Sequence, residues 1–177
     1  MSKAIENLNK AFKLFVEYPE WVTIGSVKEE TLIIQAEEKL ELKFPPTYRG
    51  FLKKYGCVEF CGNEYYGIWK KDLLGTSGSA LMKITLGDRK EWGLPHKYII
   101  VGAPGYGPYD AIDTSKPDAN GECPVVEIDG PYKDPKTGEK NQWHEGEQLA
   151  PDFGTYLYNQ SKEALENAIE NGEVEEV

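Results

Sequence analysis

The chain has 177 residues and a net charge of −10, and its apolar content is ordinary for a globular protein with one core. The charge is unevenly divided, because residues 1–97 carry a net +2 and residues 98–177 a net −12. Such an acidic half repels nucleic acid phosphates and attracts a basic protein partner. The alternative is that the acidity only keeps the protein soluble. With no apolar run of about 20 residues, no signal-peptide pattern and an odd number of cysteines, we expect a cytoplasmic protein.

Two amphipathic helices are predicted near the N-terminus. Residues 3–17 place their apolar side chains at helical spacing, and Pro19 prevents the helix from continuing. Ser26 has the spacing of a capping box and is predicted to begin a second helix that runs to about Leu40. On this second helix Glu37 is expected to face water.

The next elements are a third helix and a hairpin. Pro46 suits a first helical turn and Gly56 a helix C-terminus, so they are predicted to bracket a helix with Phe51 on its buried face. Residues 57–61 and 65–69 are two short strand candidates separated by Gly-Asn-Glu, which indicates a hairpin.

Three neighbouring strands organise the rest of the chain. They are predicted at Tyr98–Gly102, Tyr109–Thr114 and Cys123–Ile128, and short connections favour antiparallel neighbours in one sheet. Residues 80–92 before them fit either a helix or a loop, because Gly87 weakens the helical pattern. Asp152 is expected to cap a final helix.

Several residue pairs invite a chemical interpretation, and each has a simpler one. Cys57 and Cys61 would lie about 13 Å apart in a strand, too far to share a zinc ion, so we predict no metal site. Asp110 and Asp113 point to opposite strand faces, so we expect Asp110 to lean inward and bond loop amides. The glycine-rich loop at residues 102–108 precedes the strand that carries Asp110 and Asp113. Because this loop is not followed by a helix, we predict no nucleotide binding. We therefore predict no cofactor and no catalytic residues.

Aromatic side chains in or beside the predicted hairpins and loops are better candidates for a site. Tyrosine and tryptophan are favoured anchors at protein interfaces, although many aromatics only close a small core. Acidic residues of the second half would complement them by steering a basic partner. The predicted partner-binding residues are Tyr66, Trp69, Tyr106, Tyr109, Asp110, Glu122, Glu127, Asp129 and Trp143.

The order of these elements resembles the SMI1/KNR4 (SUKH) superfamily. The first matching stretch, Ile34–Tyr55, is a helix carrying a glutamate, then a proline and an aromatic helix closed by Gly56. The second, Leu94–Val126, contains a Leu-Pro, an apolar strand, a glycine loop and a strand ending in Asp113. The third is the closing aromatic helix in Leu149–Tyr158.

The resemblance implies an α+β fold with a single mixed, mainly antiparallel sheet and helices packed against it. We expect one domain over residues 1–177, with its core at about 26–160 and an acidic helical extension at 161–177. Many bacterial members look like immunity proteins that bind and neutralise toxin domains, often nucleases. Eukaryotic relatives look like regulatory scaffolds, which is the rival interpretation. A hydrolase using surface carboxylates is a third and weaker one, since the resemblance implies no catalytic residues.

Overall fold

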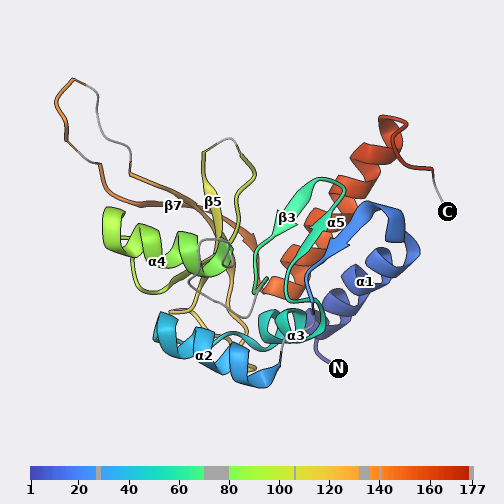
Figure 1. Cartoon of the computed structure of the whole chain (residues 1–177), viewed down its shortest axis with the longest axis horizontal. Coiled ribbons are helices and arrows are strands. Elements are labelled where there is room, and N and C mark those ends of the chain that lie inside the picture. Colours follow the sequence, from blue (N-terminus) through green and yellow to red (C-terminus); the bar gives the residue numbers. More distant parts are fainter. Residues whose placement is uncertain (27–28, 70–79, 106, 132–135, 140, 176–177) are drawn as a thin grey trace.

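The computed structural model in Figure 1 describes the whole chain except residues 27–28, 70–79, 106, 132–135, 140 and 176–177. Its helices are α1 (Lys3–Glu17), α2 (Glu30–Leu40), α3 (Pro46–Tyr55), α4 (Ala80–Trp92) and α5 (Phe153–Glu170), with a 3-10 turn η1 (Pro19–Trp21). Its strands are β1 (Val22–Ile24), β2 (Val58–Phe60), β3 (Asn63–Tyr65), β4 (Tyr98–Gly102), β5 (Tyr109–Asp113), β6 (Val125–Asp129) and β7 (His144–Ala150).

The predicted α+β class is confirmed, and the three central strands are antiparallel neighbours as expected. They lie in the order β4-β5-β6-β7, while β1-β2-β3 form a second antiparallel sheet, so the strands make two sheets rather than a single one. The sheets approach each other where the backbone N–H of Tyr66 donates to the carbonyl oxygen of Val101 at 2.8 Å. A register irregularity between Ile100 and Gly102 accompanies this contact. Because β3 ends at Tyr65, this hydrogen bond is not extended into a strand pairing between β3 and β4.

The four-stranded sheet is covered by helices on both faces. Alternate residues of β4, such as Ile99 and Val101, belong to the main core with α1, α3 and α5, whereas Ile100 packs on the α4 side. Helix α5 lies along α1 (Figure 1), and this contact is close at Gly154, where an added Cβ would lie 2.2 Å from the carbonyl oxygen of Ala4. No helix in the described part of the chain is long and apolar enough to span a membrane.

Helix α3 agrees with its prediction. It runs from Pro46 to Tyr55, and Gly56 ends it at a φ of 75° that favours glycine. The side chains of Phe51 and Leu52 are fully buried. Helix α3 is therefore a central element of the core.

Helix α2 differs from its prediction in two respects. It begins at Glu30 rather than Ser26, because Glu29 has an extended backbone and provides no side-chain cap. Glu37, which was expected to face water, is only 3% exposed. Its carboxylate accepts a hydrogen bond from the backbone N–H of Phe44 at 3.0 Å and pairs with Arg49 of α3 at 2.6 Å. The chain after α2 folds back over this glutamate, which the helical pattern alone does not reveal.

Candidate partner-binding surfaces

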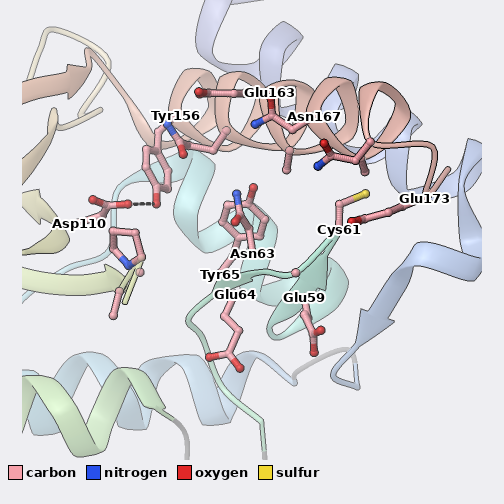
Figure 2. A pocket seen from close by; sticks show the side chains of 18 residues that line it. Glu59, Cys61, Asn63, Glu64, Tyr65, Asp110, Tyr156, Glu163, Asn167 and Glu173 are labelled. Carbon is pink, nitrogen blue, oxygen red and sulfur yellow. Dashed lines mark hydrogen bonds between the residues drawn. The ribbon is translucent and has the colours of Figure 1, made fainter. Parts of the chain in front are cut away.

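An acidic cleft of about 590 Å³ lies between the β2–β3 hairpin, the loop after β4 and helix α5 (Figure 2). Five carboxylates line it, namely Glu59, Glu64, Asp110, Glu163 and Glu173, although the side chains of Glu59 and Glu64 point to the side of the hairpin away from α5 (Figure 2). No lysine, arginine or histidine is among the described residues of its lining. The cleft therefore presents concentrated negative charge to solvent, which attracts cationic groups.

The hairpin places two of these carboxylates opposite each other. Cys61 and Gly62 form its two-residue turn, with φ values of 46° and 82°. The turn lies earlier than predicted, because Asn63 already pairs with Phe60. Glu59 of β2 is consequently the direct cross-strand partner of Glu64 on β3.

Helix α5 forms the opposite wall. Asp152 caps it as predicted, since its Oδ1 accepts a hydrogen bond from the backbone N–H of Thr155 at 2.6 Å. The helix contributes three amide side chains to the cleft in addition to Glu163, namely Gln160, Asn167 and Asn171. Amide groups both donate and accept, so this wall can hydrogen-bond peptide groups as well as cations.

Asp110 lies at the inner end of the cleft and is 9% exposed, in agreement with the inward orientation expected for it. Its partner differs from the predicted loop amides, because the hydroxyl of Tyr156 donates to Oδ2 at 2.6 Å (Figure 2). Burial, and secondarily the neighbouring charge of Glu127 on β6, raise the pKa of Asp110 despite this hydrogen bond. The cleft thus contains a carboxylate that is poorly compensated within the described chain.

Tyr66 and Trp69 lie on the other side of the hairpin. They line a depression of about 310 Å³ together with Glu59 and Glu64, and the Trp69 side chain is 43% exposed. Aromatic rings beside carboxylates form a suitable environment for a basic side chain.

Tyr109, Asp129 and Trp143 come together at a third place. They line a depression of about 350 Å³ beside α4, where the rings of Tyr109 and Trp143 stack with centroids 6.3 Å apart. The indole N–H of Trp143 donates to the carbonyl oxygen of Trp92 at 2.9 Å. The predicted surface is therefore divided among three hollows rather than continuous.

Glu122 and Glu127 are not among the lining residues of these hollows. Glu122 is 3% exposed, and its carboxylate accepts from the backbone N–H of Thr47 at 3.0 Å and from the Thr47 hydroxyl at 2.6 Å. It serves the N-terminus of α3, whose unpaired amides need an acceptor, rather than an exposed surface. Tyr106 lies outside the described residues.

A second group of carboxylates, Asp113 at the end of β5 and Glu145 near the start of β7, is paired with lysines. Asp113 is completely buried and pairs with Lys97 at 3.0 Å and Lys116 at 3.1 Å. Burial alone would raise the pKa of Asp113, but hydrogen bonds from Ser115 and Lys97 lower this pKa to about 2. The carboxylate of Glu145 accepts hydrogen bonds from Lys97, Lys116 and the hydroxyl of Tyr98. These contacts lower the pKa of Glu145 to about 2.

Comparison with known families explains this arrangement of elements. A family model described as SMI1-KNR4 cell-wall, of the SUKH group, matches residues 30–157, well over half of the chain. The chain belongs to the SMI1-KNR4 family. The matched region begins at α2 and ends within α5 at residue 157, so it includes the β2–β3 hairpin and Asp110 but not the cleft residues from Gln160 onward. No curated protein matches the chain.

The prediction missed four carboxylates of this SMI1-KNR4 domain that line the cleft: Glu59, Glu64, Glu163 and Glu173. A signal for the first two was present, because they lie symmetrically about the Cys61–Gly62 turn and must face each other once that turn is recognised. Glu163 and Glu173 carry no such local signal, since only the packing of α5 brings them to the hairpin.

The three cysteines of this SMI1-KNR4 domain are thiols rather than disulfides, and burial raises the pKa of Cys123 to about 11, which disfavours a nucleophilic thiolate. Cys57 and Cys61 are only partly buried. Among the described residues no group of three or more His, Cys, Asp or Glu side chains is arranged to hold a metal ion.

Proposed function

We propose that this chain is a non-enzymatic, cytoplasmic immunity protein that binds a cognate bacterial toxin domain and blocks its active site. The observation that carries the proposal is membership of the SMI1-KNR4 family over residues 30–157. The acidic cleft supports it, because five carboxylates without a lining cation form a surface complementary to a basic partner.

The proposed mechanism is steric and electrostatic. A toxin nuclease binds phosphate through a basic active site, so an acidic surface competes with its nucleic acid substrate. The cleft carboxylates would accelerate association, while exposed aromatics such as Trp69 and Trp143 would slow dissociation by short-range contacts. Glu127 and Asp129 remain proposed contributors to the surrounding negative field.

The second candidate function is a regulatory scaffold that binds an endogenous protein through the same surface. The family assignment and the acidic cleft agree with both functions, so only the identity of the partner separates them. An adjacent toxin gene at the same locus favours immunity.

Growth rescue is the direct test. Candidate toxins from the same locus are expressed with or without this protein, and survival is scored together with co-purification of the two chains. We expect one toxin to be lethal alone, tolerated with this protein and recovered as a complex. If every lethal toxin of the locus stays lethal and none co-purifies, the immunity function is rejected in favour of the scaffold.

A further inference from the structure

The outer face of the three-stranded sheet is open to solvent beside the segment that follows β3. Thr23, Glu59 and Glu64 are successive cross-strand partners on β1, β2 and β3, and all three are exposed. The residues on either side of Glu59 are buried on the opposite face. Both glutamates therefore point away from helix α5 (Figure 2) and line the hollow of about 310 Å³ to which Tyr66 and Trp69 also belong. We call this hollow the hairpin pocket.

The two glutamates of the hairpin pocket form a like-charge pair. Cross-strand partners place their Cβ atoms about 4.5–5.5 Å apart, so both carboxylates can contact one bound group, and their mutual repulsion destabilises the sheet. Neither glutamate forms an ion pair in the described part of the chain, whereas Glu30 and Glu37 each pair with two cations. A cation supplied by a partner would relieve this repulsion, which determines the sign of the charge that the pocket accepts.

Two aromatic side chains give the pocket a second kind of wall. Trp69 is exposed and Tyr66 is partly buried. Burial, and secondarily the charge of Glu64, raise the pKa of Tyr66, so this carboxylate lies near the phenol ring. A cation within about 6 Å of an aromatic ring centre is attracted by the ring, and arginine makes this contact more often than lysine. The pocket thus combines carboxylate oxygens with aromatic rings, which is a suitable environment for a guanidinium group.

The backbone between the two aromatic residues is held in place by the rest of the fold. The N–H of Tyr66 donates to the carbonyl oxygen of Val101 at 2.8 Å, and the N–H of Ile68 donates to that of Gly56 at 2.8 Å. Between them, Gly67 approaches so closely that an added Cβ would lie 1.9 Å from the same oxygen of Gly56. A wall that is already ordered loses little conformational entropy when a ligand binds.

We propose that the hairpin pocket binds an arginine side chain of the protein partner. The guanidinium lies between the carboxylates of Glu59 and Glu64, and its flat face rests on the ring of Trp69. Its five N–H donors lie in one plane, so a single group can bond both carboxylates and still stack on the ring. A lysine ammonium has no flat face and is more strongly hydrated. The inference deepens the proposed function, on which it rests only for the identity of the partner.

NMR titration of the full chain tests the proposal. The probe is a blocked pentapeptide with one arginine flanked by glycines, compared at low salt with the same peptide carrying citrulline, the neutral isostere of arginine. We expect the arginine peptide to shift the indole N–H of Trp69 and the backbone N–H groups of Glu59 and Glu64. The citrulline peptide should bind at least about tenfold more weakly, because it forms no charge-assisted hydrogen bond. A lysine peptide should bind less tightly than the arginine peptide.

Variants assign the binding to its two walls. Glu59→Gln with Glu64→Gln should raise the dissociation constant of the arginine peptide about tenfold, the effect of losing about one charge-assisted hydrogen bond. Trp69→Ala should raise it about two- to fivefold, the range for a cation–π contact at an exposed site. The matched control is Glu6→Gln with Glu38→Gln, which removes the same charge from exposed residues of α1 and α2 and should change the constant less than about twofold.

Thermal unfolding separates loss of binding from loss of structure. The Glu59→Gln with Glu64→Gln variant should melt no lower than the wild type, because a like-charge pair is relieved. Equal binding of the arginine and citrulline peptides would overturn the proposal, as would an equal loss of binding in the control. Chemical-shift changes centred on the acidic cleft beside α5 would also overturn it, since the cation would then bind elsewhere.

Failure of this inference is separable from failure of the immunity function. If a toxin is neutralised equally well by the wild type and by the Glu59→Gln with Glu64→Gln variant, the function holds and the pocket proposal is rejected. If no toxin is neutralised while the arginine peptide binds the pocket as expected, the pocket proposal holds and another protein with an exposed arginine is the partner.

Discussion

The acidic cleft and the core of this protein treat carboxylates in opposite ways. In the core, Glu37 and Asp113 are almost completely buried, yet each is held by two cations and by backbone N–H groups. Beside the cleft, Glu59 and Asp110 face other carboxylates instead. An acidic composition therefore does not by itself indicate a partner-binding surface. The deciding property is which carboxylates the folded chain pairs with its own cations.

The largest expected effect is at Glu37. Glu37→Ala should lower the free energy of unfolding by about 3 kcal/mol, because the buried Phe44 N–H loses its acceptor and Arg49 loses one of its two carboxylate partners and keeps Glu30. Urea unfolding measures the loss, and Glu38→Ala on the exposed face is the control. A loss below about 1 kcal/mol would show that the pair contributes no more than an exposed salt bridge.

Glu122 separates structural from partner-binding acids. Glu122→Ala should cost about 1–3 kcal/mol, because the backbone N–H of Thr47 loses its buried acceptor. Glu122→Gln keeps a side-chain oxygen and should cost less. Neither variant should change binding of the protein partner, and a loss of binding in Glu122→Gln would place this residue in the partner surface after all.

Acid titration tests Asp113. Its pKa is lowered to about 2 in the folded protein from an ordinary value of 3.8, so its stabilisation is present above about pH 4 and is lost as the pH falls toward 2. Allowing for the partly exposed lysine partners, the loss is about 1–2 kcal/mol. Asp113→Asn should therefore flatten the decline in unfolding free energy between pH 4 and pH 2. An unchanged decline would assign acid sensitivity to other carboxylates.

The smallest effect is expected at the hairpin and has the opposite sign. Glu64→Lys converts a repulsive cross-strand pair into an attractive one and should raise the free energy of unfolding by about 0.2–1 kcal/mol. The same change should slow association with a basic protein partner, so stability and affinity would move in opposite directions. Glu64→Gln is the intermediate control. A variant that loses stability would contradict the comparison between core and cleft.

Local pattern was sufficient for most elements of the fold. Pro46 and Gly56 bracket α3, Asp152 caps α5, and the three central strands are antiparallel neighbours, because each depends on residues adjacent in sequence. The α+β class followed from their order. The start of α2 at Glu30 was less predictable because no side chain caps it, and the helix over 80–92 was less predictable because Gly87 weakens its pattern.

The functional surface was predicted only in part. Tyr109 and Trp143 do stack, and Asp110 does point inward, but six of the nine chosen residues are distributed over three hollows and Glu122 lies in the interior. The choice was made by residue type, because position along the chain does not report which acids are compensated. Glu122 illustrates this limit, as its partner Thr47 lies 75 residues earlier.

The sequence by itself determined the helices, the central strands, the family and the negative charge of the second half, because periodicity, capping residues and composition are local properties. Only the tertiary structure decided which carboxylates are neutralised. Lys97 reaches Asp113, and Arg49 reaches Glu37, through contacts between separate elements. The packing of α5 beside the hairpin brings together acids for which the described chain supplies no cation. Ion pairing acts over a few ångströms in space, and that proximity exists only once the chain has folded.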